Sequence, residues 1–419
     1  MILFIFLSPM TIRRILPTMK FKGLLFAICY LLFAVNTNAQ TLSPTGKISL
    51  LTVSPGEELY SAFGHSALWV YDYERGIDRV YNYGTFDFRT EGFYVKFVQG
   101  TLPYTLSVSS SYNILEGSRQ SNRSVIEQEL NLSATQKEKL FLLLETNYLP
   151  ENREYLYKFF YDNCSTRLRD ALVAACGDSL VYSNQPILGK AKSYRQLMNL
   201  YLQNHKPVGL AMNIAIGLPS DKICTPQQEM YLPDNLMTHF SKAKLGGKSL
   251  VKSSKQIVEK IQAKTTFWDS IADPTYFFLV LYVFYFIFKK LKGVSVSNYD
   301  TRLPLWFDKT LLGILGFVGL ILTPLWFLTD HGVTDWNQSL LIFIPFHVVV
   351  LFFLNKPAHY QWLSKYFMAC LVVLFAGLFV TIVGIFWNGF SFWPTQLLFF
   401  YALLAERYYS LSKRFKVVG

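Results

Sequence analysis

Five apolar segments follow Trp268, and they constrain the fold of this chain more than any other feature of the sequence. Their cores span residues 276–288, 311–328, 340–354, 366–387 and 390–405. A helix needs roughly 17–25 predominantly apolar residues to cross a bilayer. Three of the five cores are shorter than this and need the flanking Trp, Tyr and Pro residues. Because five such segments follow one another, we predict an all-α transmembrane domain with five helices over residues 266–419.

The composition divides the chain into two parts. Charged residues are common up to about residue 265 and become rare inside the apolar segments that follow. Over the whole chain, 51% of the residues are hydrophobic and 17% are aromatic, which is more apolar than an ordinary soluble protein. We therefore predict a globular domain over residues 40–265, joined to the transmembrane domain.

The net charge of +12 is consistent with binding to nucleic acid or to anionic lipid. The sequence contains no zinc-finger spacing, Gly-rich basic tail or aromatic ribonucleoprotein motif, so we exclude nucleic acid as a partner. The basic residues of the carboxy-terminal part lie beside the apolar segments, where they orient a membrane protein.

Loops that contain lysine or arginine alternate with loops that contain neither. The basic residues follow the first segment (Lys289, Lys290, Lys292, Arg302), separate the third from the fourth (Lys356, Lys365) and follow the fifth (Arg407, Lys413, Arg414, Lys416). The other two loops, residues 329–339 and 388–396, contain neither residue type. Since basic loops stay in the cytoplasm, we predict a cytoplasmic carboxy terminus and a globular domain on the outer side of the membrane.

The amino terminus predicts the same orientation. Residues 19–40 combine a basic start, an apolar run and a small-residue end, as in a secretory signal peptide cleaved after Ala39. We therefore expect residues 1–39 to be a signal peptide, with Met19 as a candidate start. Because Gln40 rather than Cys follows the cleavage point, we do not expect the mature chain to carry a lipid anchor.

The globular domain mixes strand and helix patterns. Residues 47–54, 66–73 and 78–88 are rich in aromatic and β-branched residues and are separated by turn residues, which is typical of strands. Ser133 is followed three residues later by Gln136, the capping-box pattern that opens a helix. We predict an α+β domain.

The stretch "YDNCSTRLRDALVAACG" predicts a helix with Cys164 in its first turn. A buried stripe recurs at helical spacing (Leu168, Ala171, Leu172, Ala175). Asp162 or Asn163 suits the N-cap, and Gly177 suits the end of the helix. Free N–H groups and the helix dipole stabilise a thiolate at such a position. This pattern favours a nucleophilic cysteine, although Cys164 alone is also consistent with a small buried side chain.

A cysteine nucleophile needs a base, and the globular domain contains three histidines. His65 follows Gly64 at the start of a predicted strand, whereas His205 lies in a polar turn and His239 in a helix that we expect to be solvated. We therefore predict His65 as the base. Taken alone, His65 is also consistent with a hydrogen-bonded histidine of the core.

The base in turn needs an orienting acceptor, and the following strand supplies candidates. Asn82 is our prediction for the third catalytic residue, with Asp87 as the second choice. Tyr81 and Tyr83 are its neighbours on the same strand.

Two further sets of residues leave alternatives open. Cys176 and Cys224 either form a disulfide that leaves Cys164 free, or all three thiols are unpaired. Polar residues also gather in the outer loop 329–339 (Asp330, His331, Asp335, Trp336, Asn337), and His347 lies in the third segment. The loop is either merely solvated or helps to seat a substrate at the membrane surface, and His347 either caps a carbonyl group or contributes to that site.

Four motifs in order, "FGHSALWVYD", "VYNYGTFDF", "YDNCSTRLRD" and "GLPSDKICTPQQEMYLPDNL", precede segments that carry "TDHGVTDWNQSLLIFIPFH". This combination resembles the Lnb-type lipoprotein N-acyltransferases of Gram-negative bacteria, over nearly all of the mature chain. The order of His before Cys is also similar to permuted papain-like hydrolases and acyltransferases, including the lecithin:retinol acyltransferase group with its "NC" helix start.

The resemblance implies a permuted papain-like extracytoplasmic domain and a thiol-dependent acyltransferase. Cys164 would take an acyl chain from a phospholipid as a thioester, and His65 would serve as its base. The acceptor would be the α-amine of a diacylglyceryl-lipoprotein. No metal or organic cofactor is implied. Asp221 and residues 231–234 match a family motif to which we assign no role.

Two other functions remain open at this stage. A cell-wall or phospholipid hydrolase would use the same Cys/His pair, and a non-catalytic membrane assembly protein would need only the membrane domain.

The loop charges generate a testable topology. We expect alkaline phosphatase, which requires export, to be inactive when fused after Gly419 and active when fused after residue 265, because the basic loops stay in the cytoplasm. Alkaline phosphatase activity at Gly419 would contradict the predicted topology.

Overall fold

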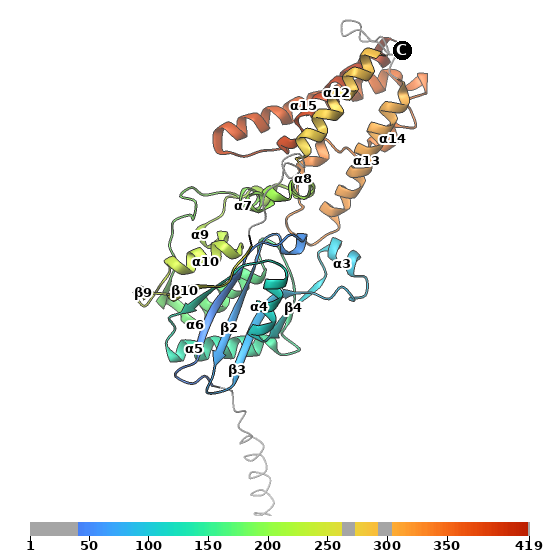
Figure 1. Cartoon of the computed structure of the whole chain (residues 1–419). Helices are drawn as coiled ribbons and strands as arrows, with labels where there is room; N and C mark the ends of the chain where they lie inside the picture. The colour runs from blue at the N-terminus through green and yellow to red at the C-terminus, as the bar shows by residue number, and fades with distance from the viewer. Residues whose placement is uncertain (1–40, 262–272, 292–303, 418–419) are drawn as a thin grey trace, which may run out of the picture.

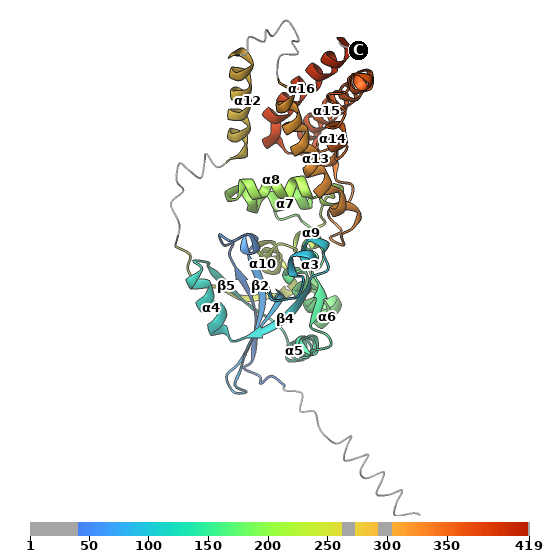
Figure 2. The same cartoon turned by 90° about the vertical axis from the view of Figure 1, so that its right-hand side faces the viewer.

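The computed structural model describes residues 41–261, 273–291 and 304–417. The predicted signal peptide, residues 1–39, lies outside the described residues, as do Lys292 and Arg302 of the first basic loop. The chain forms a mixed α/β domain built from its amino-terminal part and a helical region built from its carboxy-terminal part. Figures 1 and 2 show α7 and α8 between the two.

A seven-stranded antiparallel sheet forms the centre of the amino-terminal domain, in the order β10-β5-β1-β2-β3-β4-β6. The three predicted strands are confirmed as β1, β2 and β3. The strands of the sheet are β1 (Lys47–Val53), β2 (His65–Asp72), β3 (Ile77–Thr85), β4 (Pro103–Ser109), β5 (Val125–Leu130), β6 (Glu154–Leu156) and β10 (Val251–Val258). A small second sheet pairs β7 (Leu180–Val181), β8 (Lys244–Leu245) and β9 (Lys248–Ser249).

Successive strand residues point to opposite faces of the sheet, and apolar residues lie on both faces. Helices therefore cover both faces. On one face, apolar residues of β1 and β2 pack against α5 (Ala134–Tyr148), α6 (Cys164–Cys176) and α10 (Pro233–Lys242). The other face packs against α4 (Ser111–Gln120). The remaining helices of the domain are α3 (Phe93–Gln99), α7 (Tyr194–Tyr201), α8 (Lys206–Ala215) and α9 (Pro226–Glu229).

Among the described residues of the carboxy-terminal region, three helices are long and apolar enough to cross a membrane, whereas we expected five. They are α12 (Pro274–Leu291), α13 (Leu305–Phe327) and the helix that includes α15 (Tyr360–Asn388). The last helix, α16 (Leu398–Val417), is long but carries several charges. Its Arg407 is buried and bonds both carboxylate oxygens of Asp308 on α13, at 2.8 and 2.9 Å.

The third apolar segment differs most from expectation, because only α14 (His347–Val350) is α-helical and turns flank it. Pro345 cannot donate a backbone hydrogen bond and therefore interrupts a regular helix here. The segment instead lies antiparallel along α13, with Phe343 beside Gly319 and Val348 beside Gly316. Irregular backbone is tolerated at membrane depth where protein covers it, and the small residues of α13 allow this close approach.

His347 does not cap a carbonyl group in this segment. Its Nε2 lies 2.9 Å from the hydroxyl of Tyr408, and its Nδ1 lies 2.8 Å from the hydroxyl of Tyr366. The histidine therefore joins α14 to α15 and α16.

Two glycines of α13 provide a matched test of this packing. A Cβ at Gly319 would clash with the carbonyl oxygen of Phe343, whereas a Cβ at Gly313 would meet, among the described residues, only Leu351 Cδ1, at 3.8 Å. We expect Gly319→Ala to lower the melting temperature of the detergent-solubilised protein. Gly313→Ala should leave it unchanged or raise it, since Ala favours a helix over Gly by about 1 kcal/mol. Equal melting temperatures for the two variants would contradict the packing described here.

Candidate active site

The first turn of α6 is fixed by the side chain of Asn163, which confirms the predicted helix start. Its Oδ1 accepts hydrogen bonds from the N–H groups of Ser165 (2.9 Å) and Thr166 (3.0 Å). Its Nδ2 donates to the carbonyl oxygen of Tyr231 at 2.8 Å. Because Asn163 is buried and bonded on both sides, the backbone at Cys164 is held in one position.

Cys164 is the first helical residue, and its side chain is 8% exposed. Ser66, on β2, contributes to the lowered pKa of the thiol, and the hydroxyl of Ser165 lies 3.9 Å from the sulfur. The hydroxyl groups of Ser66 and Ser165 lie 3.0 Å apart and join β2 to α6. Within the described part of the chain, the N–H of Cys164 has no hydrogen-bond acceptor. A backbone donor without an acceptor therefore lies directly beside the sulfur of Cys164.

The structure brings together the three residues that the sequence predicted. His65 opens β2 close enough to Cys164 for each residue to shift the pKa of the other, and its Nε2 lies 3.3 Å from Oδ1 of Asn82 on β3. The amide of Asn82 donates to the carbonyl oxygen of Val80 and to Ser109 Oγ, which sets Oδ1 toward the histidine. Nε2 therefore carries a proton, and Nδ1 is the ring nitrogen left for the thiol.

The electrostatics of the pair favour its charged form. Burial is the largest influence on Cys164 and acts to raise its pKa, but the charge of His65 and the hydrogen bonds from His65 and Ser66 hold the pKa below its usual value. Burial likewise acts to lower the pKa of His65, but the charge of Cys164 and the hydrogen bonds with Cys164 and Asn82 raise it above its usual value. A thiolate beside an imidazolium is the reactive form of a cysteine nucleophile.

The other candidates for the orienting residue point elsewhere. Asp87 is exposed and pairs with Arg89 at 2.9 Å. Tyr81 donates its hydroxyl proton to Glu145, and the hydroxyl of Tyr83 accepts from Asn147 at 2.7 Å.

The other two histidines of the domain differ in their surroundings. His205 lies in the turn before α8, as expected. His239, which we expected on a solvated helix, is fully buried, with Nε2 lying 3.5 Å from Oε2 of Glu229. The expectation was wrong because α10 packs its inner face against the sheet. Neither histidine contacts Cys164 or His65 within the described ranges.

Sequence reasoning missed two residues near the pair. Arg123 precedes β5, and its charge opposes the raised pKa of His65. Its Nε donates to the carbonyl oxygen of Ser54 at 2.7 Å, while its Nη2 is buried without a partner among the described residues.

The second residue is Tyr157, which lies beside Gly84. A Cβ added to Gly84 would be 3.4 Å from Cε2 of Tyr157 and 3.8 Å from Cβ of Cys164. The glycine at position 84 is a sequence signal for such a close approach, and the structure gives it a positive φ.

The described cysteines form no disulfide, so the open choice is resolved in favour of free thiols. Cys176 packs in the core beneath the sheet, whereas Cys224 packs in a different cluster, with Phe160 and Tyr194. Burial raises the pKa of Cys176 to about 11 and that of Cys224 to about 12. Across the described segments, no group of three or more His, Cys, Asp or Glu residues is arranged to hold a metal ion.

The outer loop 329–337 joins the two parts of the protein rather than projecting into solvent. Asp330 pairs with Lys158 at 3.1 Å, and the N–H of Gly217 donates to the carbonyl oxygen of Val333 at 2.7 Å. Asn337 donates to the carbonyl oxygens of Ile214 and Ala215 at the end of α8. The loop therefore sets the position of the amino-terminal domain on the membrane helices.

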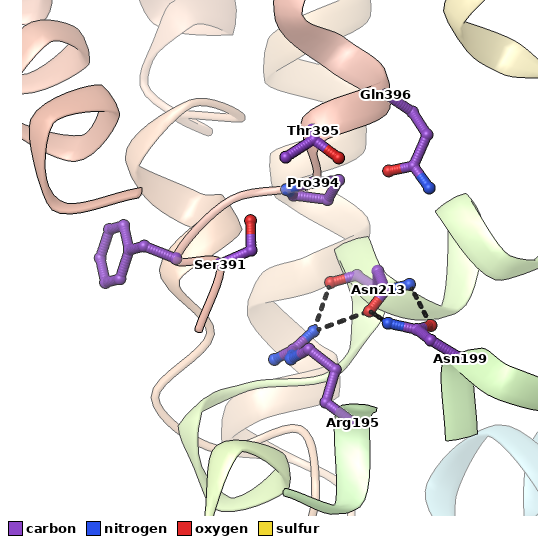
Figure 3. A pocket seen from close by; sticks show the side chains of 8 residues that line it. Arg195, Asn199, Asn213, Ser391, Pro394, Thr395 and Gln396 are labelled. Atoms are coloured by element: carbon purple, nitrogen blue, oxygen red, sulfur yellow. Dashed lines mark hydrogen bonds between the residues drawn. The ribbon is translucent and has the colours of Figure 1, made fainter. Parts of the chain in front are cut away.

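Asp221, from the motif without an assigned role, lies near the contacts between this loop and the amino-terminal domain. Arg195 on α7 bonds both of its carboxylate oxygens, at 2.7 and 3.1 Å. Arg195 also donates to Asn213, at one side of a cavity of about 100 Å³ (Figure 3). The cavity is lined by Arg195, Asn199, Asn213, Ser391, Phe392, Pro394, Thr395 and Gln396. The guanidinium N–H groups of Arg195 donate to Asp221, to Asn213 and to nearby carbonyl oxygens. Arg195 therefore links α7 to the end of α8 and to the segment that carries Asp221.

The Cys164–His65 pair generates a prediction about pH. In wild type, alkylation of Cys164 by iodoacetamide should persist below the pKa of an ordinary thiol. We expect His65→Ala to move the midpoint of the pH–rate curve upward by about 1–3 units, because burial, which raises the pKa, is then unopposed by the imidazolium. His205→Ala is the matched control and should leave the midpoint unchanged. Coinciding curves for wild type and His65→Ala would show that the histidine does not stabilise the thiolate.

Both parts of the chain match models of one known family. Residues 36–199, which include the candidate site, match the Lnb N-terminal periplasmic domain. Residues 266–414 match the Lnb transmembrane domain. No curated protein and no solved structure matches the chain. The chain therefore belongs to the Lnb family, with a periplasmic amino-terminal domain followed by a multi-span transmembrane domain.

Proposed function

We propose that this protein is a lipoprotein N-acyltransferase that carries the acyl chain as a thioester on Cys164. Membership of the Lnb family is consistent with lipoprotein N-acylation. The observation that carries the proposal is the pairing of a helix-start thiol with His65, in a domain joined to membrane helices. A membrane-anchored donor and a membrane-anchored acceptor both reach such a site.

In the first step, the Cys164 thiolate attacks an ester carbonyl of a phospholipid. The free N–H of Cys164 is placed to stabilise the oxyanion that forms, and removing one such donor typically costs about 10²–10³-fold in rate. The imidazolium of His65 gives its proton to the departing alkoxide. A lysophospholipid leaves, and the acyl chain remains on sulfur.

In the second step, the α-amine of a diacylglyceryl-cysteine attacks the thioester. His65 is now neutral and accepts the proton that the amine loses, which regenerates the thiolate–imidazolium pair. Asn82 orients the ring in both steps through its contact with Nε2. Because Cys164 is only 8% exposed, water competes poorly with the amine.

The same geometry supports a finer description of the fold. A cysteine at a helix start facing a histidine on a strand is the papain-like arrangement, with His before Cys along this chain. We further infer five membrane passes, from α12, α13, residues 338–356, α15 and α16. The antiparallel contacts between residues 338–356 and α13 support the third pass, despite its irregular backbone.

A transfer assay tests the proposal. Incubating the purified protein with labelled phospholipid should give a hydroxylamine-sensitive adduct, absent in Cys164→Ala. A diacylglyceryl-cysteine peptide should then discharge the adduct as N-acylated peptide, detected by mass spectrometry. His65→Ala should lower the rate by about 10²–10⁴-fold, and Asn82→Ala by less.

His205→Ala serves as the control and should keep the wild-type rate, because no contact links it to the pair. If the adduct forms but only free fatty acid is released when the peptide is present, the protein is a phospholipid hydrolase. If no variant of the pair changes the rate, neither residue is catalytic.

A further inference from the structure

The short helix α3 exposes apolar side chains on the domain surface. Tyr94 is 77% exposed, and Val95, Phe97 and Val98 are each at least half exposed. Phe88, in the turn before the helix, is 64% exposed. Soluble surfaces rarely gather this many large apolar groups without a partner.

The position of α3 indicates which partner covers it. The carbonyl oxygen of Gln99 accepts from the N–H of Asp330 at 2.8 Å, and Nε2 of His331 donates to the carbonyl oxygen of Val98 at 2.8 Å. Asp330 lies three residues after Phe327, where α13 ends, so the last turn of α3 is bonded to the outer end of a membrane helix. Figure 1 shows α3 beside that end of α13. Its apolar side chains therefore lie at the level of the membrane surface.

A continuous series of aromatic contacts leads from α3 to the nucleophile. Phe93 of α3 lies 5.9 Å from Phe86, and Phe86 lies 5.4 Å from Tyr104 (ring centroids). Tyr104 stacks on Tyr157 at 4.5 Å. Tyr157 is the ring beside Gly84 and Cys164, and the charge of Cys164 contributes to its raised pKa.

We propose that α3 inserts its apolar face into the outer leaflet and that the series Phe93–Phe86–Tyr104–Tyr157 receives an acyl chain of the donor phospholipid. Aromatic side chains are favoured at the membrane–water interface, and apolar rings suit a hydrocarbon chain. The second half of the proposal rests on the proposed acyl transfer at Cys164, whereas the contact of α3 with lipid does not.

Photo-crosslinking tests the lipid contact independently of any reaction. We would place p-benzoylphenylalanine at position 97 or at position 73 in the full-length protein in membranes. Tyr73 is the matched control: it is 84% exposed and follows the end of β2 opposite to His65. We expect phospholipid adducts at position 97 and not at position 73. Equal or absent adducts at position 97 would overturn the insertion of α3.

The ratio of the acylation rates with two acyl donors, one long-chain and one short-chain, tests the acyl path. We would measure acylation of Cys164 by long-chain phosphatidylethanolamine in vesicles and by p-nitrophenyl acetate in water, and compare their rates. Phe86→Ala and Tyr104→Ala, in the middle of the series, should lower the vesicle-to-acetate ratio by about tenfold, the scale of removing an interface aromatic. Tyr73→Ala should keep the wild-type ratio. An unchanged ratio in the Phe86 and Tyr104 variants would overturn the path.

The two experiments separate this inference from the proposed function. If wild-type Cys164 is acylated by neither donor, the proposed chemistry fails, and the crosslinks still decide whether α3 contacts lipid. If wild type is acylated by both donors while the ratio is unchanged in the Phe86 and Tyr104 variants, the chemistry stands and the acyl path fails.

Discussion

The side chain of Asn163 is the contact on which the rest of the site depends. Its Oδ1 holds two N–H groups of the first turn of α6, and its Nδ2 reaches the carbonyl oxygen of Tyr231. It leaves the N–H of Cys164 unbound beside the sulfur. The cap therefore serves stability and reactivity together, because the same bonds that begin the helix aim its dipole at the thiol.

A second constraint sets the height of this site above the bilayer. The loop after α13 contacts three elements of the periplasmic domain: α3 through Gln99, the segment before α6 through Lys158, and the end of α8 through Asn337. Three attachments fix a rigid body in position, whereas one would leave it free to rotate. Under the proposed function, this attachment keeps the nucleophile within reach of substrates that remain in the membrane.

Local features of the sequence were sufficient to predict much of the site. The strand start at His65, the helix start at Cys164 and the choice of Asn82 depend on residues close in the chain, and the structure brings them together. The burial of His239 and the turns around Pro345 depend instead on packing against distant elements. No periodicity in a single segment reports such packing, and this is why sequence reasoning placed both incorrectly.

The free thiols have a consequence for survival in an oxidising compartment. Cys176 and Cys224 stay protonated at neutral pH because burial raises their pKa values to about 11 and about 12, and protonated thiols exchange slowly with disulfides. The pKa of Cys164 is lowered instead, and only in the folded domain, where β2 places His65 and Ser66 beside the first turn of α6. Among the described thiols of the periplasmic domain, Cys164 is therefore the one most open to oxidation, since oxidation of a cysteine follows its thiolate character.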